Sequence, residues 1–269
     1  MTQPTPVESP PVTPPRYVGL AGRKGSGKST LADALVEHGY VPIALADPLK
    51  QRLAALFALD PEFFFGPTAL KEAPLSNDII LSPAYWTGVW ARWQKTGYWR
   101  DLLEGASEEA LARSHDHAAW AFSLLASSPE VSPRKIMQVL ATEYARQLHP
   151  PAWTNEWRRV SAAVQAGALY HPRTGLLPGA CGAPPTGVVC HDLRFLNECA
   201  MLRSLGGRVF YLDADSRIGP RVDTHSSEPL YAEIAAEVDT CVRTGTIEQT
   251  RDAVLYDLGI APYTTPAAP

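Results

Sequence analysis

The chain has 269 residues, of which 45% are hydrophobic and 19% charged, and its formal net charge is -4. These values are typical of one large globular domain that buries a core without covalent staples. The acidic balance excludes a general attraction to nucleic acid or anionic membranes, although a local basic groove stays open. No apolar run approaches the ~18 residues that span a bilayer, and the start lacks the apolar core of a signal peptide, so we expect a cytoplasmic protein without membrane partners.

Both ends of the chain are rich in proline and have little to bury. We expect residues 1–15 and 262–269 to be disordered tails around a folded domain of residues 16–261. The cysteines show no C-x-x-C spacing, which argues against a zinc site or a redox pair. We expect all four to be buried reduced thiols: Cys181, Cys190, Cys199 and Cys241.

The first ordered segment reads as strand, loop and helix. The apolar run YVGLA begins at Tyr17, and after the loop Leu31 and Leu35 stand one helical turn apart. The run VPIALA predicts a second strand. Asp47 and Pro48 then predict the N-cap and the first residue of another helix.

The middle of the chain is less regular. From residue 60 to 131 we expect short helical pieces with many aromatic residues, and residues 76–131 are interpreted as a helical insertion. A clear helix is expected from Ser132 and Pro133 to Leu148, followed by a helix over residues 153–164. Residues 170–186 are rich in proline and glycine and predict a loop.

The last third returns to alternating strands and helices. The run GVVC predicts a strand buried on both faces that ends on His191 and Asp192. A helix to Leu205, the strand RVFYL, a helix after Ser227 and a short strand near Cys241 follow, and Thr246 with Gln249 predicts a capping box for the last helix. Such alternation predicts an α/β fold with a parallel sheet covered on both faces.

Residues 22–29, GRKGSGKS, match the phosphate-binding pattern G-x-x-x-x-G-K-[ST] between a predicted strand and a predicted helix. Glycines let backbone N–H groups converge on phosphate oxygens, and the helix N-terminus adds positive potential. Lys28 is expected on the β- and γ-phosphates, and the Ser29 hydroxyl on Mg²⁺. We predict triphosphate binding by Gly22, Lys24, Gly25, Ser26, Gly27, Lys28, Ser29 and Thr30.

The rest of the chain favours a kinase over a switch GTPase or a motor ATPase. It contains no N-K-x-D guanine motif. Asp192 is followed by Leu193 rather than by the glutamate that many ATPases use to activate water.

A motif series in chain order resembles that of phage deoxynucleoside monophosphate kinases: GLAGRKGSGKSTLADAL, ALADPLK, KEAPL, SPRKIMQVLATEYARQLHPPAW, DLRFLNE and DTHSSE. The series spans Val18 to about Leu258. It departs from the family at Ala141, where glycine is usual, and in the enlarged stretch between KEAPL and SPRK. The resemblance implies a P-loop kinase three-layer sandwich with a central parallel sheet and an inserted helical region that closes over the acceptor.

The resemblance also implies the reaction. The γ-phosphoryl group of ATP, bound with Mg²⁺, would move to the 5′-phosphate of a deoxynucleotide, giving a diphosphate that serves as a DNA precursor. Because this nucleophile is already anionic, no strong general base is required, and catalysis is positioning and charge neutralisation. A phage-encoded enzyme would act in the host cytoplasm.

Several site residues follow from this reading. We predict Lys28, Asp47, Asp192 and Arg194 as catalytic residues, Ser29 and Asp192 as magnesium ligands, and Lys50, Thr142, Glu143, Arg146, Trp153, Asn197 and Glu198 as substrate-binding residues. Arg146 and Lys50 are assigned to the acceptor phosphate and Glu143 to its sugar or base. Ordinary alternatives stay open: Asp47 as a helix cap, Glu143 with Arg146 as an exposed ion pair, and HSSE as a cap of the next helix.

Two groups of aromatic residues are interpreted as structural. His115 and His117 have no other plausible ligand beside them and are expected to be surface residues rather than metal ligands. Trp86, Trp90 and Trp93 lie at helical spacing and are expected to pack rather than to stack on bases.

Two rival functions remain. One is a kinase that phosphorylates a hydroxymethylated base within phage DNA, with the aromatic insertion gripping the strand; only this reading makes DNA a partner. The other is a regulatory ATPase that acts through partner proteins. The accepted base and the oligomeric state, including a homodimer, stay open.

Overall fold

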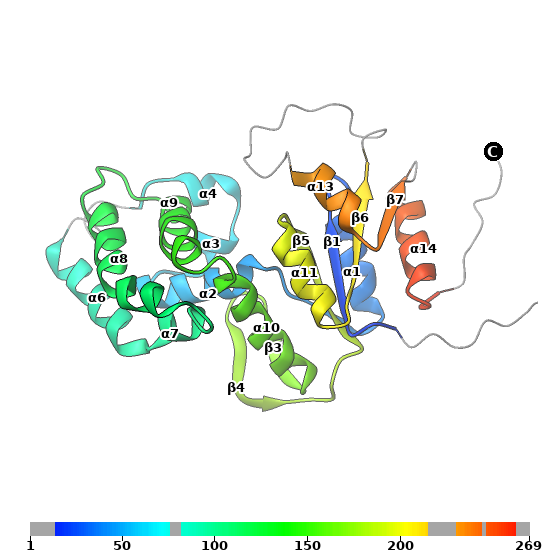
Figure 1. Ribbon diagram of the computed structural model, residues 1–269, viewed down its shortest axis with the longest axis horizontal. Coiled ribbons are helices and arrows are strands. Elements are labelled where there is room, and N and C mark those ends of the chain that lie inside the picture. Colours follow the sequence, from blue (N-terminus) through cyan, green and yellow to red (C-terminus); the bar gives the residue numbers. More distant parts are fainter. Residues whose placement is uncertain (1–13, 76–81, 215–229, 244–245, 262–269) are drawn as a thin grey trace, which may run out of the picture. The chain divides into compact units, whose positions relative to one another are not determined.

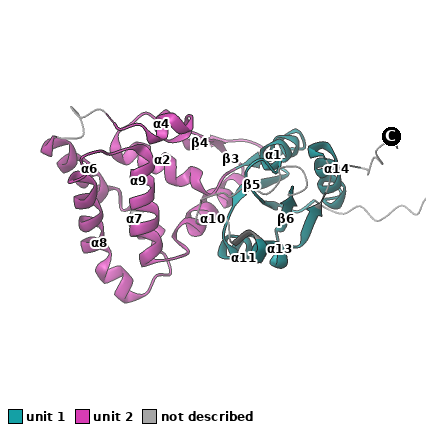
Figure 2. Ribbon diagram, turned by 90° about the horizontal axis from the view of Figure 1, so that it is seen from above, with its two compact units in different colours: residues 1–42, 185–269 teal, residues 43–184 magenta. Residues whose placement is uncertain are grey.

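The computed structural model describes residues 14–75, 82–214, 230–243 and 246–261 (Figure 1). Contacts divide the chain into two compact units, which are described separately: unit 1 combines residues 1–42 with residues 185–269, and unit 2 is residues 43–184 (Figure 2). The tails expected at residues 1–15 and 262–269 lie outside the described residues, except for Pro14 and Pro15.

Unit 1 contains a five-stranded sheet in the order β2-β5-β1-β6-β7. Every neighbouring pair is parallel. The strands are β1 (Tyr17–Ala21), β2 (Tyr40–Pro42), β5 (Gly187–Leu193), β6 (Arg208–Asp213) and β7 (Thr240–Arg243). The prediction of an α/β fold with a central parallel sheet is therefore confirmed.

Helices cover both faces of this sheet (Figure 2). One face carries α1 (Lys28–Glu37) and α14 (Ile247–Asp257), and the other carries α11 (Leu196–Ser204) and α13 (Leu230–Glu237). Leu20 on β1 packs with Leu35 and Val254 on the first face. On the opposite face a Cβ at Gly19 would lie 2.5 Å from Leu202 Cδ1, so glycine lets α11 approach closely.

Unit 2 is mainly helical. Its elements are α2 (Ala46–Phe57), α3 (Glu62–Phe65), α4 (Thr68–Glu72), α6 (Pro83–Thr96), α7 (Tyr98–Leu102), α8 (Glu108–Ala126), α9 (Pro133–Gln138), the π-helix η1 (Val139–Arg146), α10 (Ala152–Gln165) and an antiparallel hairpin of β3 (Ala168–His171) and β4 (Gly175–Cys181).

The helices of the 76–131 segment belong to the core of unit 2. One hydrophobic cluster joins Phe57 of α2 and Tyr144 of η1 with Trp93 of α6 and Phe122 of α8. Trp90 stacks on Trp93 with ring centroids 4.9 Å apart and an interplanar angle of 11°. The tryptophan stripe therefore packs, as the sequence predicts.

The N-cap prediction for Asp47 is wrong. Helix α2 begins at Ala46, because Leu45 already has helical dihedral angles, φ -56° and ψ -35°. Asp47 lies in the first turn instead, where its Oδ2 accepts a hydrogen bond of 3.1 Å from the Ala44 N–H. The strand before it is also shorter than expected and ends at Pro42, whose ring nitrogen has no hydrogen to donate.

The loop prediction for residues 170–186 is also wrong, since the end of β3 and all of β4 lie there. Gly175 has a φ of 84° and follows a turn in which the Thr174 N–H bonds to the His171 carbonyl at 3.2 Å. A two-stranded sheet has only edge strands, and edges tolerate proline. This explains why Pro178 does not prevent the pairing.

The cysteines divide into two pairs. Cys190 and Cys199 are buried, but Cys181 and Cys241 are exposed, so the expectation of four buried thiols is half wrong. Cys181 ends the strand β4 of the hairpin and Cys241 lies in β7, at the edge of the parallel sheet. Edge positions leave side chains uncovered.

Candidate active site

The phosphate loop joins β1 to α1 in unit 1, and its shape depends on glycine. Gly22, Gly25 and Gly27 have φ angles of 137°, 86° and 95°, values that other residues rarely adopt. A Cβ at Gly22 would also lie 2.7 Å from the Leu212 carbonyl oxygen. Glycine at this position is therefore required twice, by the backbone conformation and by space.

Lys28 places its ammonium group inside this loop. The Nζ atom donates to the Gly22 carbonyl at 2.5 Å, to the Arg23 carbonyl at 2.7 Å and to Ser26 Oγ at 3.4 Å. Lys28 is also the first residue of α1, whose N-terminus carries partial positive charge. Phosphate oxygens are stronger acceptors for an ammonium group than carbonyls, so the loop is suited to bind a polyphosphate.

Other predicted triphosphate ligands lie on the accessible side of the loop. Lys24, Gly25, Ser29 and Thr30 are exposed. Ser26 is buried and its N–H donates to the Arg23 carbonyl at 3.1 Å. Its Oγ accepts the 3.4 Å hydrogen bond from Lys28 Nζ, so Ser26 faces the inside of the loop.

Asp192 lies on the neighbouring strand at the same edge of the sheet. Gly19 pairs with Cys190 and Ala21 pairs with Leu193, so β5 holds one extra residue between these pairs, beside Asp192. Such bulges re-aim side chains next to functional sites. In open parallel sheets this carboxyl edge, beside the central strand, is where ligands bind.

The Asp192 carboxylate accepts a weak bond from a buried thiol. Cys190 Sγ donates to Asp192 Oδ1 at 3.4 Å. Burial, together with the charge of Asp192, raises the pKa of Cys190 well above its usual value, so the thiol keeps its proton. Carboxylate and hydroxyl oxygens are the ligands that Mg²⁺ prefers, so Asp192 and Ser29 fit this ion.

The turn after β5 is held by Glu198. Its Oε2 accepts hydrogen bonds from the Arg194 N–H at 2.7 Å and the Phe195 N–H at 3.1 Å, and the side chain is buried. Glu198 thereby caps the start of α11. Arg194 and Asn197 beside it are exposed. A contact of these three residues with a substrate stays a prediction.

In unit 2, Asp47 and Lys50 meet on α2. Lys50 Nζ lies 3.1 Å from Asp47 Oδ1 and 4.8 Å from the centre of the Phe65 ring. Lys71, from the KEAPL motif, belongs to the same neighbourhood: burial, with the nearby cations Lys50 and Arg134, lowers its pKa. Lys71 is not among the site residues predicted from the sequence, although the KEAPL motif that contains it was a usable signal.

The predicted acceptor residues Thr142, Glu143 and Arg146 all lie on η1. Thr142 is exposed, and Glu143 and Arg146 are half-buried. Glu143 Oε1 accepts a bond of 3.3 Å from Gln138 Nε2. The buried stripe expected opposite them is confirmed, since Ile136, Val139 and Leu140 are buried, at 0%, 2% and 1% exposure.

Trp153 is buried beneath this helix. Its indole Nε1 donates to the Ala141 carbonyl at 2.9 Å. This hydrogen bond shows that Trp153 supports the backbone of η1. Direct contact between Trp153 and an acceptor stays a prediction.

The site residues are divided between the two units. Unit 1 carries the phosphate loop with Asp192, Arg194, Asn197 and Glu198, and unit 2 carries Asp47, Lys50, Thr142, Glu143, Arg146 and Trp153. The DTHSSE motif, residues 223–228, lies outside the described residues.

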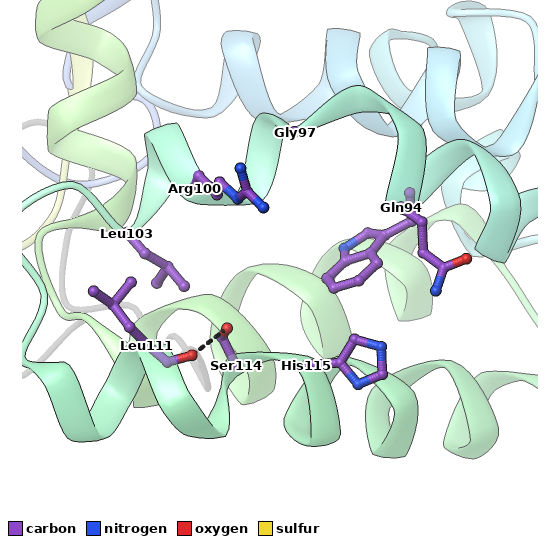
Figure 3. Close-up of a pocket in the computed structure, with 8 residues that line it drawn as sticks. Gln94, Gly97, Arg100, Leu103, Leu111, Ser114 and His115 are labelled. Atoms are coloured by element: carbon purple, nitrogen blue, oxygen red, sulfur yellow. Dashed lines mark hydrogen bonds between the residues drawn. The ribbon is translucent and has the colours of Figure 1, made fainter.

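A separate hollow of about 250 Å³ lies among α6, α7 and α8 (Figure 3). Its described lining contains none of the site residues predicted from the sequence. It is lined by Trp93, Gln94, Gly97, Arg100, Leu103, Leu111, Ser114 and His115. His115 is exposed, as expected.

The parallel sheet, the glycine-dependent phosphate loop and the adjacent Asp192 are consistent with a P-loop kinase fold. The chain is 26% identical over 241 residues to a protein of Acanthamoeba polyphaga mimivirus that carries the provisional name deoxynucleotide monophosphate kinase. The alignment covers 86% of this chain and 90% of the relative, so it includes both units.

This similarity supports nucleotide kinase activity in general. No protein-family model matches the chain. Among the described helices, none is both long and apolar enough to cross a membrane.

Proposed function

We propose that this protein is an ATP-dependent deoxynucleoside monophosphate kinase. The observation that carries the proposal is the phosphate loop, with Lys28 Nζ inside it and Asp192 on the adjoining strand. The viral relative's provisional name supports a nucleotide as the acceptor.

Phosphoryl transfer to an anionic acceptor requires little from the protein beyond neutralising charge and positioning the two substrates. An anionic oxygen of the acceptor's 5′-phosphate attacks the γ-phosphorus of ATP, a new P–O bond forms, and the bond to the β-phosphate oxygen breaks to release ADP. Lys28 would neutralise the charge on the transferred group. Ser29 and Asp192 would hold Mg²⁺ directly or through its water ligands, and the ion would supply further neutralisation.

On the acceptor side, the proposed ligands are cations and polar groups of unit 2. Lys50 and Arg146 are suited to the acceptor phosphate, and a guanidinium group can bind it through two parallel hydrogen bonds. Glu143 and Thr142 would contact the sugar or base. Arg194 of unit 1 is proposed to neutralise charge on the transferred group.

A panel of acceptors tests this function. Each deoxynucleoside and ribonucleoside monophosphate, and single-stranded DNA with and without hydroxymethylated bases, is incubated with ATP and Mg²⁺, and ADP and product are quantified. We expect phosphorylation of one or more deoxynucleoside monophosphates. Transfer only to DNA would support the rival DNA kinase, and ADP release without any phosphorylated product would support the regulatory ATPase.

A further inference from the structure

The helix that carries the predicted acceptor residues has an uncommon backbone. The eight residues of η1, Val139–Arg146, form a π-helix, in which each backbone hydrogen bond spans five residues rather than four. Where such a segment returns to α-helical hydrogen bonding, one backbone carbonyl is passed over and accepts no bond from a backbone N–H. A half-buried carbonyl that is passed over needs another donor.

Side chains from outside the segment donate to two of its carbonyls. His117 of α8 lies with Nε2 2.7 Å from the Glu143 carbonyl oxygen, and Trp153 of α10 donates from Nε1 to the Ala141 carbonyl at 2.9 Å. Since a carbonyl only accepts, the hydrogen must be on His117 Nε2. His117 is therefore not the simple surface residue that the sequence suggests.

The imidazole ring is held in place on α8 and η1. Its centroid lies 5.0 Å from that of Trp120 and 5.8 Å from that of Tyr144, with interplanar angles of 21° and 24°. Tyr144 is buried and is the residue next to Glu143. A ring stacked in this way keeps its Nε2 aimed at one backbone position.

We propose that His117 is a positioning residue for the acceptor nucleotide. This inference rests on the proposed function, because it assumes that Glu143 and Arg146 bind the acceptor. By holding the Glu143 carbonyl, His117 sets the path of the η1 backbone and so the directions in which these two side chains leave it. The 76–131 segment thereby acts on the acceptor through a hydrogen bond as well as through the shared core.

Two substitutions at His117 separate the effect of its hydrogen bond from the effect of its ring packing. His117→Phe keeps a flat ring beside Tyr144 but removes the donor, and we expect the KM for the monophosphate to rise about tenfold while the Kd for ATP stays unchanged. His117→Gln offers an amide N–H at a reach close to that of Nε2 and is expected to restore most of the acceptor affinity. Initial rates and ATP titration measure these effects. If His117→Phe fails to fold, His117→Asn, whose amide is too short to reach, takes its place.

Phe122→Leu is the matched control for general damage to α8. Phe122 is buried on the same helix and lies near Phe57 and Trp90, so this change should lower the Tm without raising the acceptor KM. The inference is overturned if His117→Phe leaves the KM unchanged, if Phe122→Leu raises it equally, or if His117→Gln behaves like His117→Phe. A wild-type protein that transfers phosphate to no monophosphate would instead reject the proposed function, and the inference with it.

Discussion

Lys28 holds an unusual position for a charged side chain, because its ammonium group bonds to carbonyls of its own loop. These carbonyls already satisfy part of its hydrogen-bonding capacity, so the phosphates of the proposed ATP substrate would exchange one set of acceptors for a better one. The side chain is only half-buried, and it does not belong to the hydrophobic core. Its chemical role and its contribution to folding can therefore be separated.

Replacing Lys28 with alanine should abolish phosphoryl transfer, by at least about 10³-fold, because the developing charge loses its cation. The Tm should change by no more than a few degrees. Rates with the best acceptor and a thermal unfolding curve measure the two effects. A variant that turned over at the wild-type rate would contradict the assignment of the phosphate loop, and Lys95→Ala, which removes an exposed lysine in the last turn of α6, serves as a charge-matched control.

The thiols offer a second test at the scale of single residues. Burial raises the pKa of Cys190 well above its usual value, and burial with the nearby Glu198 charge raises that of Cys199 to about 12. Only the thiolate is alkylated, so both should resist iodoacetamide at pH 8 in the folded protein. Exposed Cys181 and Cys241 should react first. Mass spectrometry of labelled peptides, with and without denaturant, distinguishes the pairs, and fast labelling of Cys190 would contradict its burial.

At the scale of elements, α2 and α10 are joined by a buried carboxylate. Glu156 is 3% exposed, and its Oε1 accepts from Arg52 Nη2 at 2.8 Å and from Arg159 Nη2 at 2.8 Å. Arg52 comes from α2, more than one hundred residues earlier in the chain. Trp157 beside it donates from Nε1 to the Ile43 carbonyl at 2.9 Å. Polar side chains thus tie α10 to the start of unit 2.

Glu156→Gln should therefore lower the free energy of unfolding by about 2 kcal/mol, because two guanidinium groups lose their anion while staying partly out of water. The comparison is Glu109→Gln on α8, where the pair with Arg113 is exposed and 3.6 Å long. That change should cost less than about 0.5 kcal/mol. Denaturant titration of both variants measures the difference, and equal losses would show that burial of Glu156 adds nothing.

At the scale of the whole molecule, the predicted machinery is shared between two units of the chain. Lys28 lies in unit 1 and Arg146 in unit 2. Arg146→Ala should therefore weaken binding of the monophosphate. Its KM should rise about tenfold or more, because a charge-assisted hydrogen bond is lost, while the Kd for ATP stays within about twofold.

The same kinetic and titration measurements check this prediction, with Arg113→Ala as a control for loss of an exposed arginine. Equal loss of ATP and acceptor affinity would contradict an acceptor role for Arg146. A change in Tm alone would support the alternative that Arg146 serves an ordinary surface ion pair.

Much of unit 1 was predictable because its signals are local. The strand YVGLA, the glycine-rich loop and the following helix occupy one continuous segment, and the conformations of Gly22, Gly25 and Gly27 follow from residue type. The capping box at Thr246 is also local, with Thr246 Oγ1 accepting from the Gln249 N–H at 3.1 Å. Patterns of this kind need no knowledge of the rest of the chain.

Local patterns in the sequence were enough to predict the alternation of strands and helices, the phosphate loop and the buried stripe opposite Thr142, Glu143 and Arg146. The folded chain was needed to see that these three residues lie on a π-helix, that His117 bonds to the Glu143 carbonyl, and that Glu198 holds a turn. Periodicity reports burial within one element, whereas a backbone carbonyl looks the same at every position in a sequence. Its side-chain partner, 26 residues away for Glu143, becomes identifiable only when the chain has folded.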